Sequence, residues 1–512
     1  MTDTVLGIDV GTSGCRVAAY DPALREVAAA TARYQVSLPG PGRAEIDADE
    51  VWAAVAGCLR TVNEQLDRSP QALAIAVQGE TVLPVSADGE ALAMAPISTD
   101  ARAVEETAAI IDAVGARRLR VITGQRPHPM FSIGKIAWTR WIPGLWQRSA
   151  RFHCLGDFLA LRMGVPPAID YTMAARTMAF DCHQQAWSAE ILDAADVPEM
   201  LMPPAVPVGA ELGRLPPAIA GSLGFTQAPV LVAGAHDQAC ALLGAEATEP
   251  GQAAVSLGTS ECLTVNVDGW LESLTETSFP AYRPWQSDRW MVLAGIPSGG
   301  ATLDWLAGML TGSGENHGLG QLMSLLPAEP AHVLALPHFA GSGTAENDPV
   351  SRGAFIGLSH STSAGELFRA VLEASGFEVA RSVAALAAAG IVISELRASG
   401  GGTAATAPVQ IRSTAAGFPL DVVPGHATAR GAAMIAGAAT GFYPSLTVAG
   451  TSVRPASSVR PDPEAQRWYQ RQRKRYALLY PALRPVYHFP TGDDADEPCG
   501  QPCGHSHQAG DR

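Results

Sequence analysis

Residues 5–21, VLGIDVGTSGCRVAAYD, join two apolar runs through a Gly-Thr-Ser-Gly turn and carry an acidic residue, Asp9, at the mouth of that turn. Small residues in a tight turn leave backbone N–H groups open to an anion, so the pattern predicts a hairpin that binds phosphate. A lone carboxylate beside such N–H groups would repel a nucleotide, and Asp9 is therefore expected to hold Mg²⁺ against the phosphate oxygens. The alternative is an ordinary hairpin in which Asp9 caps the turn.

A second copy of this pattern occurs half a chain later. Residues 253–268, AAVSLGTSECLTVNVD, again contain an apolar strand, Gly-Thr-Ser, a short polar break, an apolar strand and a closing Asp. An internal repeat at this spacing predicts two similar domains. Their two Gly-Thr turns could close on opposite sides of one nucleotide.

A candidate catalytic base lies just before the second copy. Residues 229–245, PVLVAGAHDQACALLGA, predict a buried strand, a turn bearing His236, Asp237 and Gln238, and a helix of small residues. Asp237 would stand at the helix N-terminus between the two halves, where a base facing the γ-phosphate is needed. A helix N-cap is the alternative role, and the two roles can coexist.

A polar edge follows the buried strand predicted at residues 72–77, ALAIAV. That strand delivers Gln78, Gly79, Glu80 and Thr81 to its C-terminal end, where ligands bind in open α/β sheets. An amide and a carboxylate can each bind neighbouring OH groups, so this edge is a candidate hydroxyl-binding site. A solvated loop is the alternative.

Periodicity predicts the elements that position these residues. Apolar residues at helical spacing predict helices over residues 44–67, 186–195 and 359–389, and HPMFSIGKIAW predicts a turn that leads into a helix. Residues 82–97 predict a hairpin around Asp88-Gly89, and the Pro-rich residues 202–217 predict an extended connector.

Glycines mark two places in the second half. A Gly-Gly pair enters a predicted helix over residues 295–305, and Gly400, Gly401 and Gly402 lie between a predicted strand and a further helix. Because glycine has no Cβ, this triplet could let the backbone approach a flat ligand such as an adenine base.

Length, composition and charge limit the function classes. A chain of 512 residues with 47% hydrophobic and 17% charged residues predicts a compact protein of two large domains. The net charge of -15 argues against a nucleic-acid or membrane-surface partner, and the basic residues 471–475 are expected on a solvated helix face. No leader or membrane span is predicted, so the expected location is the cytosol. Six scattered cysteines are expected to be buried thiols: Cys15, Cys58, Cys154, Cys182, Cys240 and Cys262.

The C-terminal tail after about residue 490 is polar, lacks periodicity and is expected to be disordered. Cys499, Cys503, His505 and His507 form a C-x₃-C-x-H-x-H cluster that could bind Zn²⁺. Adventitious metal binding is the alternative, because no apolar residue nearby offers a core.

The ordered set of motifs resembles the FGGY family of carbohydrate kinases over about residues 5–443. The matching segments are GIDVGTSGCR, GAHDQ, SLGTSE, NDPVSRGAFIGLSHSTSAGELFRAVLEASGFE and SGGGTAATAPVQIRSTAAGFPLDVVPG. The resemblance implies an α/β fold of two actin-like (ribonuclease H-like) domains with an interdomain cleft. It also implies ATP with Mg²⁺ in the cleft and phosphoryl transfer to a sugar or polyol hydroxyl.

The resemblance assigns roles to individual positions. Asp237 matches the catalytic base, Gln238 matches a substrate-binding neighbour, and Gln78, Gly79 and Glu80 fall where members bind substrate hydroxyls. Arg16 with Thr12 and Ser13 matches the first phosphate motif, and Thr259 matches the second. The positions expected to bind the nucleotide are Gly11, Thr12, Ser13, Arg16, Gly258, Thr259, Gly300, Asp304, Gly401, Gly402 and Thr406.

Domain boundaries follow from the same motifs. We expect an N-terminal sugar-binding domain over residues 1–246, a C-terminal nucleotide-binding domain over 247–455, a helical extension over 456–490 and the tail over 491–512. The resemblance allows a homodimer, and the oligomeric state stays open.

Two departures from the family pattern bear on specificity. Ser98 and Thr99 precede Asp100 where many pentulose kinases of the family carry Trp, so the sugar pocket is expected to differ. Residues 405–408 and 413–414 depart from the usual sequence after the glycine triplet, which leaves the adenine contacts less defined than the phosphate contacts.

Three functions remain open from the sequence. The first is an ATP-dependent kinase of a pentulose such as xylulose, with a polyol such as glycerol or erythritol as the alternative acceptor, since Glu80-Thr81 also resembles glycerol kinases. The second is an actin-like ATPase, and the third is a catalytically silent sugar-binding homologue. Intact Asp9 and Asp237 with two Gly-Thr turns favour the kinase.

Overall fold

The structure is a computed structural model that describes residues 3–285, 288–312, 317–339, 341–446, 449 and 453–489. The tail and its Cys499, Cys503, His505 and His507 lie outside the described residues, so the choice between a zinc site and adventitious metal binding stays open. The six other cysteines are buried and free, as predicted. None of the helices in the described part of the chain combines the length and apolar character needed to span a bilayer.

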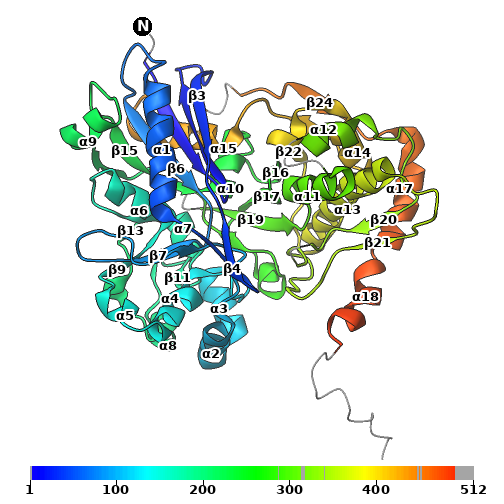
Figure 1. The fold of residues 1–512 in the computed structure, drawn as a ribbon, viewed down its shortest axis with the longest axis horizontal. Coiled ribbons are helices and arrows are strands. Elements are labelled where there is room, and N and C mark those ends of the chain that lie inside the picture. The colour runs from blue at the N-terminus through cyan, green and yellow to red at the C-terminus, as the bar shows by residue number, and fades with distance from the viewer. Residues whose placement is uncertain are drawn as a thin grey trace, which may run out of the picture.

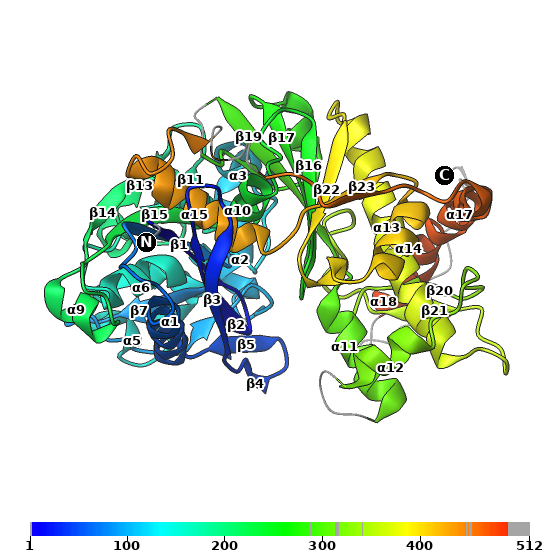
Figure 2. The same ribbon diagram turned by 90° about the horizontal axis from the view of Figure 1, so that it is seen from above.

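Two lobes, each built on one mixed sheet, form the molecule (Figures 1 and 2). The first sheet has the order β14 (Glu211–Arg214), β15 (Val230–His236), β6 (Ala72–Val77), β1 (Val5–Val10), β2 (Gly14–Tyr20), β3 (Glu26–Arg33). The second has the order β18 (Ala281–Tyr282), β19 (Arg289–Ile296), β17 (Glu261–Asp268), β16 (Gln252–Leu257), β22 (Glu395–Ser399), β23 (Leu420–Val422), β24 (Ser457–Val459).

The two sheets share one topology. In the first, β3, β2 and β1 are antiparallel and β1, β6 and β15 are parallel. In the second, β19, β17 and β16 are antiparallel and β16, β22 and β23 are parallel. The two predicted phosphate hairpins, β1–β2 and β16–β17, therefore occupy equivalent places, and the predicted pair of α/β domains is confirmed.

Helices cover both sheets, and smaller strands lie before β6 and between β6 and β15 in the chain. The first lobe contains α1 (Ala48–Asn63), α2 (Val104–Val114), α3 (Ala116–Thr123), α4 (Ser132–Trp138), α5 (Leu145–Arg148), α6 (Leu155–Arg162), α7 (Tyr171–Ala175), α8 (Ala189–Ala194), α9 (Pro217–Ser222) and α10 (Asp237–Gly244). Its smaller strands are β4 (Ser37–Gly40), β5 (Arg43–Ile46), β7 (Val82–Val85), β8 (Ala95–Pro96), β9 (Arg151–Cys154), β10 (Ile169–Asp170), β11 (Phe180–Asp181), β12 (Ala186–Trp187) and β13 (Ala205–Val206).

The remaining elements follow β19 in the chain. They are α11 (Gly300–Thr311), α12 (His317–Ser324), β20 (Leu334–Leu336), β21 (Ala354–Ile356), α13 (Ala364–Ala388), α14 (Thr406–Ala416), α15 (Ala427–Ala439), α17 (Pro463–Tyr476) and α18 (Leu479–Tyr487).

Three predicted helices begin later than the sequence pattern indicates. The helix predicted over residues 44–67 is α1, whose Asp47 cap accepts from Asp49 N–H, while residues 44–46 belong to β5. The helix predicted over 186–195 is α8, because β12 pairs with β11 before Ser188 caps the helix. The helix predicted over 359–389 is α13, which begins after its Ser363 cap. In each case a side-chain cap sets the start.

The hairpin predicted over residues 82–97 is only partly correct. A turn forms around Asp88-Gly89, with Gly89 N–H donating to the Ser86 carbonyl oxygen at 3.0 Å. However, β7 pairs along its length with β9, and β8 pairs with β5. Likewise, the predicted connector over 202–217 contains the edge strand β14. Long-range strand partners of this kind leave no local signal in the sequence.

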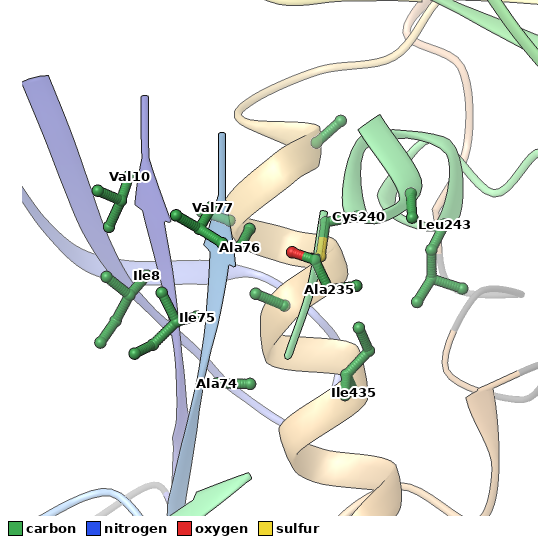
Figure 3. Packing of buried hydrophobic residues seen from close by; sticks show 14 of the residues in the cluster. Ile8, Val10, Ala74, Ile75, Ala76, Val77, Ala235, Cys240, Leu243 and Ile435 are labelled. Atoms are coloured by element: carbon green, nitrogen blue, oxygen red, sulfur yellow. The ribbon is translucent and has the colours of Figure 1, made fainter. Parts of the chain in front are cut away.

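Helix α15 lies late in the chain but packs on the first sheet, against β1 and β6, and on α10. Figure 3 shows this apolar layer, to which Ile8 and Ile75 come from the strands, Cys240 and Leu243 from α10, and Ile435 from α15. This part of the predicted second domain, 247–455, therefore packs on the first lobe.

The crossing of α10 and α15 requires glycine at the contact. A Cβ on Gly431 of α15 would overlap the carbonyl oxygen of Cys240, whereas a Cβ on Gly57, inside α1, would meet nothing within 4 Å. Gly→Ala in a helix interior normally stabilises by about 0.5–1 kcal/mol. We expect Gly57→Ala to follow this rule and Gly431→Ala to destabilise by about 1–3 kcal/mol, because two backbones must move apart. Urea unfolding of both variants tests the contrast, and equal shifts would contradict the close crossing.

Candidate active site

The turn between β1 and β2 is held by Tyr34. The Tyr34 hydroxyl lies 3.0 Å from the carbonyl oxygen of Gly14 and also contacts that of Gly11, whose N–H donates across the turn to Gly14 at 3.0 Å. No described group accepts a hydrogen bond from the N–H groups of Thr12 and Ser13. Both N–H groups are therefore available to an anion.

Asp9 lies on β1, opposite Arg16 of β2. Burial raises the pKa of the Asp9 carboxyl to about 7, and the nearby Arg16 opposes that rise. Since no described group donates a hydrogen bond to the Asp9 carboxylate, the alternative role of a turn cap finds no support in the contacts of the described residues. The Arg16 guanidinium forms an ion pair with Glu26 at 2.5 Å and donates a hydrogen bond to the Thr31 hydroxyl at 3.3 Å.

The second turn, between β16 and β17, packs against the start of α11. Gly300 N–H donates to the Gly258 carbonyl oxygen at 2.8 Å, and Ala301 N–H donates to that of Thr259 at 3.1 Å. The N–H groups of Thr259 and Ser260 again donate to no described acceptor. This turn thus repeats the open N–H groups of the first.

The glycine triplet lies beside the same turn, and packing alone explains why two of its three positions are glycine. A Cβ on Gly400 would lie 2.8 Å from the Leu257 carbonyl oxygen, and one on Gly402 would lie 2.8 Å from the Leu257 Cβ. Only Gly401 faces open space. Gly400 and Gly402 therefore allow the chain to pack closely on the end of β16. Only Gly401 has the open space that the expected approach of an adenine base would need.

Two further predicted nucleotide residues lie on the helices around this turn. Asp304 lies on α11, one turn after Gly300, and is exposed. Thr406 is the first residue of α14 and is also exposed. The structure thus gathers the predicted residues of the second lobe at one edge of its sheet.

The polar edge after β6 meets α10 because β6 and β15 are parallel neighbours, with Val77 paired to His236. Gln78 N–H continues the sheet by donating to the Val10 carbonyl oxygen at 3.0 Å, so Gln78 also lies beside the first turn. The Gln78 side chain is buried, and neither of its polar atoms has a hydrogen-bond partner among the described residues. A buried amide without partners is able to bind a polar ligand.

Glu80 adopts a left-handed backbone with φ of 64°, which is costly for a residue with a Cβ. Its carbonyl oxygen accepts from the Ser132 hydroxyl at 3.1 Å and from Lys135 Nζ at 3.4 Å. The carboxylate forms an ion pair with Arg176, and both side chains are buried. The conformation is therefore fixed from two sides.

Asp237 is the first residue of α10, as the sequence predicts, and α10 lies at the centre of Figure 2 between the first sheet and the second lobe. Burial raises the pKa of its carboxyl to about 7, Asp9 and Glu80 add to the rise, and hydrogen bonds from Gln238 oppose it. The Gln238 side chain also accepts from the Ser256 hydroxyl of β16 at 3.1 Å. Gln238 thus links the carboxylate to the second lobe.

Four buried polar residues at this edge were not assigned a role from the sequence: Lys135, Arg176, His236 and Tyr282. A Cβ on Gly79 would lie 3.0 Å from His236 Nε2 and 3.3 Å from Arg176 Nε, so these two side chains fill the space that a side chain at position 79 would need. Of these four residues, only His236 could have been assigned to the site from the sequence, because it is adjacent to Asp237. Lys135, Arg176 and Tyr282 lie in segments without a motif.

Among the described residues, no group of three or more His, Cys, Asp or Glu side chains could hold a metal ion. A metal held at this edge by a single carboxylate would therefore depend on phosphate oxygens and water for its other ligands. This arrangement is usual for Mg²⁺ bound with a nucleotide.

Two family models match the chain: the FGGY family of carbohydrate kinases, N-terminal domain, over residues 4–244, and its C-terminal domain over residues 253–440. The chain is 31% identical to the xylulose kinase of Escherichia coli K12, over 94% of this chain and 99% of that protein. It is 30% identical to the glycerol kinase of Bordetella parapertussis, over 91% of this chain and 96% of that protein. The crystal structure of a xyloylose kinase from Brucella ovis matches with a TM-score of 0.81 and 28% identity, over 94% of this chain and 100% of that one.

Proposed function

Because the chain belongs to the FGGY family of carbohydrate kinases, we propose that it transfers the γ-phosphate of ATP to a hydroxyl of a small ketose, with a pentulose such as xylulose as the first candidate. The observation that carries the proposal is the Asp237 carboxylate, which lies at a helix N-terminus beside the polar edge of residues 78–80 and has a pKa raised to about 7.

Asp237 is the proposed base. A carboxyl with a pKa near the working pH can take a proton in the reaction and release it afterwards. As the acceptor oxygen bonds to the γ-phosphorus, the bond from that phosphorus to the β-phosphate oxygen breaks, ADP leaves, and the hydroxyl proton goes to Asp237. Activity is then lost as the pH falls through the pKa of this carboxyl.

The two turns are proposed to bind the phosphates. Their N–H groups at Thr12, Ser13, Thr259 and Ser260 have no described acceptor and can donate to phosphate oxygens from both lobes. Around the rest of the nucleotide we place Gly11, Arg16, Gly258, Gly300, Asp304, Gly401, Gly402 and Thr406.

Asp9 is proposed to hold Mg²⁺ together with the phosphates. The fit rests on the chemistry of the donor, because an oxygen ligand that receives no hydrogen bond from a described group suits a hard cation. When bound, the ion would offset negative charge on the phosphate oxygens.

The acceptor is proposed to bind at the polar edge of residues 78–80. Gln78 has an unpaired amide oxygen and an unpaired amide nitrogen, which together can accept from one sugar hydroxyl and donate to another sugar oxygen. Glu80 is held rigid by Arg176, and Gln238 lies beside the base. A scaffold ATPase would have no need for buried polar groups without partners at this place. A silent sugar-binding homologue would keep them, but it would have no need for Asp9, Asp237 and the two Gly-Thr turns.

A polyol such as glycerol or erythritol is the second candidate acceptor. Glycerol kinases are among the relatives at about the same identity as xylulose kinases, and Glu80-Thr81 resembles their sequence. An identity of 30–31% does not distinguish a ketose from a polyol as the acceptor, because specificity depends on a few hydroxyl-binding groups in the pocket.

Comparing kcat/KM for xylulose, for its alditol xylitol and for glycerol tests the choice of acceptor. We expect xylulose to exceed both by about 10²-fold or more, because a site built around a polar oxygen rejects analogues that leave its buried groups unpaired. A preference for glycerol would change the proposed acceptor from a ketose to a polyol, and the proposed kinase activity would stand. Turnover that is the same with and without any acceptor would exclude both.

A further inference from the structure

One carboxylate oxygen of Asp237 faces away from the open side of the site. Oδ1 is shut off from solvent, has no full hydrogen bond within the described chain and lies 3.1 Å from His236 Nε2. The Asp237 side chain is nevertheless 24% exposed, so its exposure lies on the remaining atoms. Oδ2 is therefore the oxygen available to an acceptor hydroxyl, and Oδ1 is available to His236.

His236 is fixed on three sides. Its Nδ1 lies 2.5 Å from the Tyr282 hydroxyl, and its backbone N–H donates to the Thr172 hydroxyl at 2.7 Å. The imidazole ring also covers Gly79, where any side chain would collide with it. The ring can therefore present Nε2 to Asp237 in one orientation only.

The protonation states of His236 and Tyr282 determine which ring nitrogen of His236 carries the proton. Burial, helped by Arg176, holds the pKa of His236 well below its usual range, and burial raises the pKa of Tyr282 well above its usual range, so both rings are neutral. If the phenol donates to Nδ1, then Nε2 carries the proton and donates to Oδ1. The other tautomer would set a ring lone pair against a carboxylate oxygen.

Tyr282 belongs to the second lobe but is anchored to the first. It pairs with Met291 in the second sheet, and the N–H of the preceding Ala281 donates to the Gly124 carbonyl oxygen at 2.8 Å. Arg120 of α3 donates to the Leu274 carbonyl oxygen at 2.8 Å. The hydroxyl is thus held in place before any substrate arrives.

We propose that His236 and Tyr282 are positioning residues for the base: Tyr282 sets the tautomer of His236, and His236 holds Oδ1 so that Oδ2 points at the acceptor. This inference rests on the proposed kinase function for its kinetic consequence, but the Tyr282–His236 hydrogen bond and the 3.1 Å contact between His236 Nε2 and Asp237 Oδ1 are present without any substrate.

Other groups also face Asp237 and enter its pH dependence. Asp9 of β1 and Glu80 after β6 raise its pKa, and Gln238 lowers it. Arg176, at the end of α7, lies beside His236 next to Gly79 and lowers the pKa of the imidazole. Cys240 of α10 and Cys262 of β17 are both held as neutral thiols by burial.

Three substitutions separate positioning from packing. Tyr282→Phe removes only the hydroxyl, His236→Leu removes the donor to Oδ1, and His236→Gln returns an N–H donor near the place of Nε2. Tyr443→Phe is the matched control, because Tyr443 is also buried and, among the described residues, its hydroxyl donates only to the Asp21 carbonyl oxygen, at 2.9 Å.

We expect kcat to fall about 10-fold in Tyr282→Phe and about 10- to 10²-fold in His236→Leu, with KM for ATP unchanged, because a misaligned base costs rate and not nucleotide binding. His236→Gln should recover most of the loss. The acid limb of the pH profile should move to higher pH by about one pH unit in Tyr282→Phe, since a carboxylate that loses a donor binds its proton more tightly. Tyr443→Phe should match wild type throughout.

A second readout needs no turnover. ¹⁵N NMR of histidine-labelled protein reports the tautomer of His236, assigned by the signal lost in His236→Gln, and we expect Nε2–H in wild type and a mixture in Tyr282→Phe. An Nδ1–H tautomer in wild type, or wild-type kcat in both Tyr282→Phe and His236→Leu, would overturn the inference. If wild type phosphorylates no acceptor but shows the Nε2–H tautomer, the proposed function fails, and the inference that Tyr282 sets the tautomer of His236 stands.

Discussion

Replacing Asp237 with Asn is expected to lower kcat by about 10²- to 10⁴-fold, because the amide cannot accept the proton of the acceptor hydroxyl. The substitution keeps the size of the side chain, so nucleotide binding and the fold should persist. Initial rates of ADP release at saturating ATP and acceptor measure the loss, and the Kd for ATP measures what remains.

Stability gives an independent check on the same variant. A carboxyl whose pKa is raised to about 7 in the folded protein contributes stability that is present at low pH and is lost as the pH rises through that value. Asp237→Asn removes this loss, so at pH 8 it should be at least as stable as wild type. Asp193→Asn, an exposed Asp on α8, is the matched control and should change neither rate nor stability. Near wild-type turnover in Asp237→Asn would remove Asp237 from the role of base.

The second large effect is expected at Asp9. Asp9→Ala should raise the Mg²⁺ concentration needed for half-maximal activity about 10-fold and lower the maximal rate about 10²-fold, because a direct or water-mediated ligand is lost. Titration of Mg²⁺ at fixed ATP measures both changes.

Tyr34→Phe is the control for the turn itself, since Tyr34 and not Asp9 contacts the carbonyl oxygens of Gly11 and Gly14. We expect this variant to be less stable, with an unchanged Mg²⁺ dependence. If Asp9→Ala behaves in the same way, then Asp9 has a structural role and the metal proposal is wrong.

Local patterns in the sequence carried most of the fold and part of the site. The hairpins around Thr12 and Thr259 were predictable because a tight turn between two apolar strands is encoded within about fifteen residues. Asp237 was predictable at the start of α10 because a buried strand, a turn and a helix follow one another without interruption. Their common place in two sheets of the same topology followed from the internal repeat.

Residues that act through distant contacts could not be found in this way. Arg176 reaches Glu80 from α7 with no motif around it, and Tyr282 reaches His236 from a strand of two residues in the other lobe. The packing of α15 on α10 depends on the close approach at Gly431, its packing on β1 depends on the close approach at Gly7, and neither contact has a local signal in the sequence. Pairings of this kind depend on the assembled fold, because the partners lie far apart in the sequence.

Initial rates of ADP release with and without a ketose show whether the protein transfers phosphate to a carbohydrate. We expect release by the wild-type protein with ATP and Mg²⁺ to be slow without an acceptor and to rise at least about 10²-fold with xylulose or another small ketose or polyol, because the base has no proton to accept without an acceptor hydroxyl. An equal rate with and without every acceptor, or no ADP release under any condition, would contradict phosphoryl transfer to a carbohydrate.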